Sequence, residues 1–180
     1  MNLGSSMIQG RSVNAILSTV SDYWFPSAQK SSLAVEKYKN QLKYYTDSVV
    51  FGDKSMLEKA HENKELALGI LTDINQSSQR WNIPDQTCPA LIKSIDDFSR
   101  KASPIYMAVI MSLDDNSHVD DLMLKKMNDR GLEILKKLEA LASFYNTRLN
   151  DQLVRVRNMS HRGWWINVFM ALIIVSISLP

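Results

Sequence analysis

The sequence has few of the residues that bend or cross-link a chain: one cysteine, Cys88, with six glycines and five prolines among 180 residues. A single cysteine excludes an internal disulfide and a zinc site built on cysteines. The formal net charge of +2 is close to balance, which excludes the strongly basic surface typical of nucleic-acid binding. With 45 % hydrophobic residues, the chain is expected to form long regular elements.

Motifs that carry catalysis are also missing from the sequence. There is no glycine-rich phosphate loop and no nucleophile elbow. Glu58 and His61 have the Glu-x-x-His spacing of di-iron bundles, but the nearest second copy, Asp115 with His118, falls in a predicted turn and supplies an aspartate. We therefore expect Glu58 and His61 to lie on a solvated helix face. No metal, no cofactor and no enzymatic activity is predicted for this chain.

The longest stretch without a charged side chain is 164–180, WWINVFMALIIVSISLP. A helix needs roughly 17–25 apolar residues to cross a bilayer, and tryptophan is favoured in the headgroup layer. The sequence therefore predicts a transmembrane helix at 164–180, which we expect to be cut short in this sequence, preceded by a folded domain at 1–163.

Hydrophobic spacing elsewhere is helical, with alternating steps of three and four residues. It predicts a first helix over about 5–50, bent at Pro26, and a turn in which Gly52 ends that helix and Asp53 caps the next. Its predicted buried positions are Val13, Leu17, Val20, Trp24, Tyr38, Leu42, Tyr45 and Val49.

Three more helices are predicted over about 54–80, about 90–113 with a kink at Pro104, and from about 119 into the membrane segment. A break at 81–89 has cap candidates at Asp85 or Thr87, and 114–118 is a polar turn. The short turns predict an antiparallel, up-down-up-down four-helix bundle with long first and fourth helices. The predicted core is Leu57, Ala60, Ala67, Leu71, Ile74, Leu91, Ile95, Phe98, Ala102, Ile105, Val109, Leu135, Leu138, Ala142, Tyr145, Leu149 and Val156.

Helix lengths place loop 81–89 level with residues 22–26 and 145–149, roughly 25 Å short of the membrane. We expect an aromatic layer there that closes the base of the core: Tyr23, Trp24, Phe25, Trp81, Ile83, Phe144 and Tyr145. The same layer is also the candidate small-molecule site, because two arginines at its rim suit a carboxylate. The candidate ligand-binding residues are Arg80, Trp81, Trp24, Tyr145 and Arg148.

Below that level only two helices continue, and two helices cannot cover their own apolar faces. A homodimer is therefore expected, formed through Ile8, Val13, Ile16, Leu17, Val20, Leu149, Leu153 and Val156.

Three features together resemble a known family: Trp24-Phe25-Pro26, the turn Val50–Asp53 followed by Met56–Ala60, and a fourth helix that runs into a membrane span. This combination resembles the four-helix-bundle sensor domain of bacterial methyl-accepting chemotaxis receptors, which also occurs on sensor histidine kinases and diguanylate cyclases. The resemblance implies a dimeric periplasmic domain that binds a small molecule or a partner protein and signals across the inner membrane. The receptor class and the ligand are not implied by any motif.

Two features depart from that pattern. No first membrane span precedes the domain and no output module follows it, so we expect both to lie outside this sequence. Arg155, Arg157 and Arg162 flank the membrane segment on the domain side, where the positive-inside rule would place the cytoplasm. The alternative function is therefore a tail-anchored cytoplasmic helical interaction protein.

Overall fold

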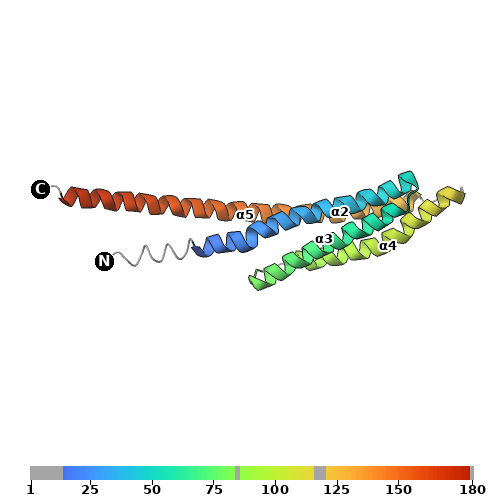
Figure 1. The fold of residues 1–180 in the computed structure, drawn as a ribbon, viewed down its shortest axis with the longest axis horizontal. Helices are drawn as coiled ribbons and strands as arrows, with labels where there is room; N and C mark the ends of the chain where they lie inside the picture. Colours follow the sequence, from blue (N-terminus) through green and yellow to red (C-terminus); the bar gives the residue numbers. More distant parts are fainter. Residues whose placement is uncertain (1–13, 84–85, 116–120, 179–180) are drawn as a thin grey trace. The chain divides into compact units, whose positions relative to one another are not determined.

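The computed structural model describes the backbone of residues 14–83, 86–115 and 121–178, and the side chains of 14–83, 86–112 and 122–159. Every regular element in these ranges is a helix (Figure 1). Residues 14–19 are helical and lead into the π-helix η1 (Val20–Trp24), which is followed by α2 (Phe25–Phe51), α3 (Ser55–Arg80), α4 (Thr87–Asp115) and α5 (Asp121–Ser178). The prediction of an all-helical chain with four main helices is confirmed.

The chain divides into two compact units. Residues 27–145 form the four-helix unit, and residues 1–26 with 146–180 form the terminal unit. The division falls within the two ranges, 22–26 and 145–149, at which the four-helix level was predicted to end. The predicted boundary between residues 163 and 164 lies inside the terminal unit and stays a prediction.

Ion pairs between helices define the packing of the four-helix unit. Lys30 of α2 meets Asp73 of α3 at 2.9 Å, and the Lys59 ammonium of α3 lies 5.9 Å from the ring centroid of Tyr44 on α2. Residue numbers increase along α2 from Lys30 to Tyr44 while their partners on α3 decrease from Asp73 to Lys59, so the two helices are antiparallel. Further ion pairs join α3 to α4 (Lys64 to Asp96, 3.2 Å) and α2 to α5 (Lys39 to Glu139, 2.7 Å).

Aromatic rings form the centre of the core. The rings of Tyr38 and Tyr45 on α2 both pack edge-on to Phe98 of α4, with centroids 6.2 and 6.1 Å away, and Tyr45 stacks on Tyr106 at 4.8 Å. Most of the predicted core of the later helices is buried: Ala60, Ala67, Leu71, Ile74, Leu91, Ile95, Phe98, Ala102, Val109, Leu138, Ala142 and Tyr145. Leu57, Ile105, Leu135, Leu149 and Val156 are only half-buried.

The buried stripe of α2 differs from the predicted one. Leu42 and Val49 are half-buried, whereas Gln41 and Ser48 are fully buried. The prediction followed large apolar residues, but the face that points inward is made of small and polar ones. Between residues 27 and 48 the buried residues of α2 are Ser27, Ala28, Ser31, Ala34, Tyr38, Gln41, Tyr45 and Ser48.

Helices α2 and α3 both end in the same way. A residue with a left-handed backbone follows each helix: Gly52, with φ 62°, directly after α2, and Asn82, with φ 52°, after the C-cap Trp81 of α3. The next amide then donates back to the carbonyl five residues earlier, Asp53 to Ser48 at 3.1 Å and Ile83 to Ser78 at 2.8 Å. These are Schellman motifs, which satisfy the last carbonyls of a helix.

The turn after α2 confirms the predicted role of Gly52. Asp53 Oδ1 accepts a hydrogen bond from the Ser55 amide at 2.9 Å, so the predicted cap at the start of α3 is also present. The cap candidate Asp85 lies outside the described residues, and Thr87 is the first residue of α4.

Prolines act on the helices without ending them. Pro26 has no amide hydrogen, and the π-turn η1 lies directly before it, where the Phe25 amide donates to the Val20 carbonyl. A widened turn therefore lies just before Pro26, and the bend predicted there stays a prediction. Helix α4 runs through Pro104, and the kink predicted there stays a prediction.

Within the part of the chain that the structure describes, no helix is both long and apolar enough to cross a membrane. The side chains of the expected transmembrane segment, 164–180, lie outside the described residues. Its backbone is helical as far as Ser178, where α5 ends.

Candidate functional site

The predicted residues Arg80 and Trp81 lie at the end of α3. Arg80 is the last residue of the helix and its side chain is exposed. Trp81 follows as the C-cap, half-buried, and its amide donates to the Ser77 carbonyl at 3.0 Å. The Schellman motif at Asn82 holds the backbone here, so it fixes the Cα positions of Arg80 and Trp81 beside the α3–α4 connection.

The other predicted ligand residues differ in exposure. Tyr145 is completely buried and lies edge-on to Phe144, with ring centroids 5.4 Å apart. Trp24 is 8 % exposed, and its ring centroid lies 4.9 Å from that of Tyr23. Arg148 is exposed. Trp24 and Arg148 belong to the terminal unit, and Arg80, Trp81 and Tyr145 to the four-helix unit, so their joint role in binding stays a prediction.

Two members of the predicted aromatic layer do not close the core. Phe25 is 57 % exposed and Phe144 is 46 % exposed. Each lies next to a buried ring along the chain, Phe25 after Trp24 and Phe144 before Tyr145, and neighbouring residues on a helix point about 100° apart. The buried faces at these points are taken by Tyr23, Trp24 and Tyr145 instead.

An open cleft of about 520 Å³ lies beside the same connection, between the end of α3 and the start of α4. It is lined by Asn75, Ser78, Gln79, Asn82, Ile83, Gln86 and Pro89. Four of these side chains are carboxamides, each of which both donates and accepts hydrogen bonds. A cleft of this volume is within the usual range for small-molecule sites.

This cleft was not predicted from the sequence, although the adjacent Arg80 and Trp81 were predicted as ligand residues. The pattern of apolar residues cannot predict a role for Asn75, Gln79, Asn82 and Gln86, because all four side chains are polar. One signal was available: asparagine is second to glycine at the left-handed position after a helix, and Asn82 follows directly after Arg80-Trp81.

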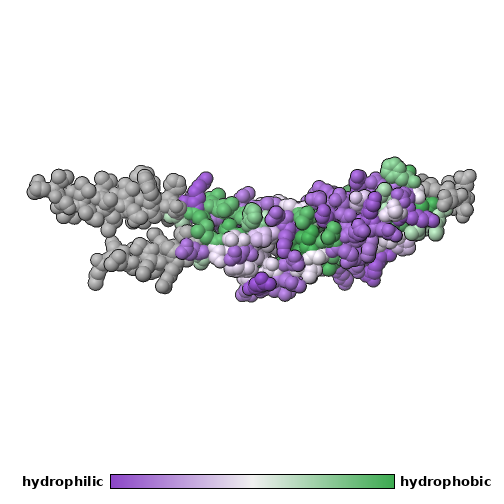
Figure 2. All heavy atoms as spheres, viewed as in Figure 1, coloured by the Kyte–Doolittle hydropathy of each residue, from purple (hydrophilic) through white to green (hydrophobic). Residues whose placement is uncertain are grey.

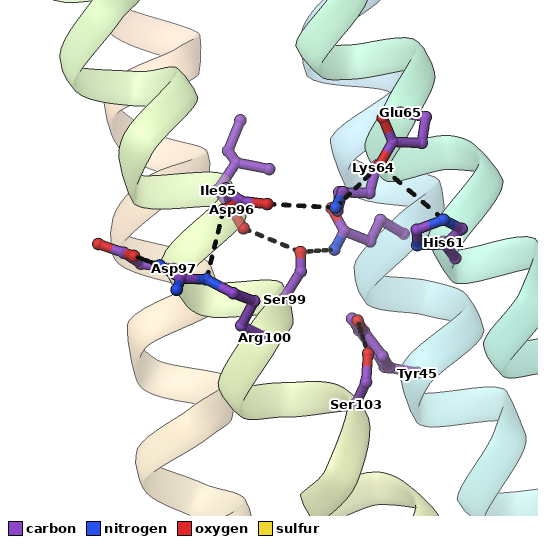
Figure 3. A network of polar contacts seen from close by, with 11 residues as sticks. Tyr45, His61, Lys64, Glu65, Ile95, Asp96, Asp97, Ser99, Arg100 and Ser103 are labelled. Carbon is purple, nitrogen blue, oxygen red and sulfur yellow. Dashed lines mark hydrogen bonds and ion pairs between the residues drawn. The ribbon is translucent and has the colours of Figure 1, made fainter.

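A second polar site lies inside the bundle, between α2 and α4 (Figure 3). Gln41 Nε2 donates to Ser99 Oγ at 2.6 Å, and Ser99 Oγ donates to the Ile95 carbonyl at 2.8 Å. One turn further along both helices, the hydroxyls of Tyr45 and Ser103 share a hydrogen bond of 2.8 Å. These matched pairs make the contact between α2 and α4 polar at two successive turns.

An ion-pair cluster lies next to this polar layer (Figure 3). The Lys64 ammonium contacts Asp96 at 3.2 Å and Glu65 at 2.8 Å, and Arg100 binds both Asp96 and Asp97. Burial lowers the pKa of Lys64, but hydrogen bonds to Glu65 and Asp96 outweigh it and raise that pKa above the ordinary value. The cluster neutralises a lysine whose side chain is mostly buried, which is a structural role.

The Glu58–His61 pair lies on the outer face of α3. Both side chains are exposed, and His61 Nε2 is 3.9 Å from Glu65. Among the described residues, no group of three or more histidine, cysteine, aspartate or glutamate side chains could hold a metal ion. His118, in the second copy of the motif, lies outside those residues.

Comparison with known proteins identifies no relative: no protein-family model, no curated protein and no solved structure matches this chain.

Proposed function

We propose that this chain is the extracytoplasmic sensor region of a bacterial transmembrane signalling receptor. In this proposal, residues 164–180 anchor it in the inner membrane and residues 1–163 face the periplasm. The observation that supports the proposal is the continuity of α5. It is a single helix of 58 residues that begins in the four-helix unit, runs through Gly163 and continues into the apolar segment. A continuous helix can pass a displacement from a ligand site to a membrane segment.

The signal in this proposal is a small movement of α5 relative to α2. A small molecule or partner protein that binds one arrangement of the helices more tightly shifts the population by that difference in affinity. The buried stripe of α2 supports such a movement, because it has no aliphatic side chain larger than alanine between residues 27 and 48. The large apolar contacts of this stripe are confined to the rings of Tyr38 and Tyr45, which pack on α4. Any catalytic output module would lie outside this chain.

We further propose that the receptor is a homodimer. In the terminal unit, Leu17 is 43 % exposed, and Leu153 and Val154 are each 46 % exposed. Figure 2 shows hydrophobic atoms on the surface of α5 next to the residues drawn in grey. Exposed apolar side chains on a helical segment of this kind are typical of an interface. Ile8 and Val13, which were also predicted there, lie outside the described residues.

The experiment that tests the proposal determines on which side of the membrane the domain lies. Cys88 is fully buried and is the chain's one cysteine, so C88A gives a cysteine-free background. A cysteine at the exposed position Glu62, E62C, is then treated with a membrane-impermeant maleimide in intact bacterial spheroplasts. A sensor domain is labelled without permeabilisation and stays with the membrane fraction.

The opposite outcome separates the two functional classes. If E62C in the membrane fraction is labelled only after permeabilisation, the domain is cytoplasmic and the chain is the tail-anchored interaction protein. If the protein leaves the membrane fraction on washing, the anchor at 164–180 is wrong.

A further inference from the structure

The described residues that line the cleft between α3 and α4 are polar or apolar, and none of them carries a charge. Among its described lining residues, the hydrogen-bonding groups are the carboxamides of Asn75, Gln79, Asn82 and Gln86 and the hydroxyl of Ser78. None is ionised at neutral pH. Ser78 is fully buried and its hydroxyl already donates to the Asn75 carbonyl at 2.8 Å, which leaves the four amides to meet a ligand.

These amides are free to bind. Gln79, Asn82 and Gln86 are exposed, Asn75 is half-exposed, and none of the four side chains has a hydrogen bond to another described residue. Ile83 and Pro89 add two apolar surfaces to the same cleft. The cleft thus combines paired donors and acceptors with apolar surface, and none of the described residues that line it is an ion-pair partner for a carboxylate or phosphate.

The residue at position 82 supports a role for the cleft. The chain has two Schellman motifs with nearly equal left-handed φ values, and one uses Gly52, the residue that adopts this backbone most easily. The other uses Asn82, whose side chain lines the cleft. Asparagine is tolerated at such a position but is less favourable than glycine, so the amide at position 82 is present at some expense of local stability.

We propose that this cleft binds a neutral, polyhydroxylated small molecule, of the size of a mono- or disaccharide. Hydroxyl groups donate and accept in the same manner as the carboxamides, and the C–H faces of a sugar ring suit Ile83 and Pro89. The inference rests on the proposed function as a ligand-binding domain and names the class of its ligand. It places that ligand beside Arg80 and Trp81 but does not require the arginine side chains.

The test is a binding measurement on the full chain in micelles of a detergent without a sugar headgroup. Saturation-transfer NMR is used to screen glucose, galactose, trehalose, sucrose and myo-inositol, with glucuronate and glucose 6-phosphate as charged probes. At least one neutral probe is expected to bind, and more tightly than the charged ones. No binding by any neutral probe at millimolar concentration, or tighter binding of the charged probes, would overturn the proposal.

Two matched variants locate the site. N82G keeps the left-handed turn and removes the amide, so affinity for the bound probe should fall about tenfold while the melting temperature stays equal or rises. G52N makes the reverse change at the other Schellman motif and should leave affinity unchanged. Equal binding by N82G and the unmodified chain would contradict the assignment. Loss of binding leaves the maleimide labelling of E62C unaffected, so failure of this inference and failure of the proposed function are distinguishable.

Discussion

Gln41 and Ser99 meet in the interior of the four-helix unit, where Gln41 Nε2 donates to Ser99 Oγ at 2.6 Å. The second polar atom of the same amide, Gln41 Oε1, is buried without a hydrogen-bond partner among the described residues. A buried polar atom in that state destabilises the fold by about 1–3 kcal/mol. The contact between α2 and α4 is therefore specific in register but weaker than an apolar contact of the same size.

Replacement of this amide by a hydrocarbon of similar shape should stabilise the protein. Q41L removes the unpaired oxygen, and Ser99 Oγ keeps its hydrogen bond to the Ile95 carbonyl at 2.8 Å. The free energy of unfolding should rise by about 1 kcal/mol, measured by urea titration with far-UV circular dichroism. The control Q79L, on the exposed end of α3, should change it by less than about 0.5 kcal/mol. A loss of stability in Q41L would mean that the buried oxygen is well satisfied in the folded protein.

Two helical glycines should respond to alanine in opposite directions. A Cβ atom at Gly131 on α5 would lie 2.8 Å from Leu42 Cδ2 and 3.3 Å from Phe98 Cζ, whereas none of the described atoms lies within 4 Å of a Cβ at Gly69 on α3. G131A should therefore destabilise by about 1–3 kcal/mol through overpacking. G69A should stabilise by about 0.5–1 kcal/mol, because alanine is the better helix former. Thermal unfolding of both variants tests the pair, and equal melting temperatures would show that α5 does not approach α2 and α4 this closely.

The buried tyrosines should make stability depend on pH in the alkaline range. Burial is the main reason that the pKa of Tyr38 is raised far above its ordinary value of 10.0, with Tyr45 adding to the effect and Arg130 opposing it. A raised pKa in the folded state means that stability is full below pH 10.0 and falls as pH rises beyond it. The pKa of Tyr106 is raised by the same two causes, burial and then Tyr45, so its contribution has the same sign.

Y38F separates this effect from the hydrogen bond that Tyr38 donates to the Gly131 carbonyl at 3.3 Å. At neutral pH the variant should be less stable by about 0.5–1.5 kcal/mol, because that bond is lost. Above pH 10.0 it should lose stability more slowly than the unmodified protein. Urea titrations at neutral and alkaline pH measure both quantities, and parallel pH profiles would show that the Tyr38 hydroxyl can ionise in the folded state.

The dimer proposal predicts that cysteines in the terminal unit form crosslinks between two copies of the chain, and that a cysteine on α3 does not. In the C88A background, L17C lies at an exposed position of the terminal unit, and E62C lies on the exposed face of α3. Oxidation in membranes should link L17C, or a cysteine within one helical turn of it, into a covalent dimer and leave E62C monomeric. Absence of a dimer at every position of that turn would contradict the homodimer.

Sequence spacing predicted the fold well where large apolar side chains mark the buried face. The stripes of α3 and α4, such as Ala67, Leu71 and Ile74, follow a regular step of three and four and are buried as expected. Turn chemistry was equally informative, because Gly52 and Asp53 act as their residue types predict. These features are local, and local sequence determines them.

The spacing failed where polar residues occupy the core. Gln41 is buried because Ser99, on a helix 58 residues away in sequence, satisfies part of its polarity, and the buried Ser48 hydroxyl donates to the Tyr45 carbonyl of its own helix. Phe25 and Phe144 are exposed because another residue of the same turn already fills the inward direction. The cleft is formed where the chain turns from α3 into α4, from Asn75 through Asn82 to Pro89, and a helical periodicity does not extend across such a turn.

The central claim is that α5 passes the state of the four-helix unit to the membrane. Residues 1–180, preceded by a first membrane span, are fused to the output module of a chemotaxis receptor. Two variants of this fusion are made in the cysteine-free C88A background, each with one pair of new cysteines. K39C with E139C replaces the 2.7 Å ion pair between α2 and α5, and E133C with K137C replaces a 2.6 Å pair within α5 alone. A short bis-maleimide should shift the basal kinase output through the first pair and not through the second, and the shift should disappear when a flexible Gly-Ser linker interrupts α5 after Arg157. Output that is unchanged when α2 is tied to α5, or that shifts equally with the linker present, would contradict the claim.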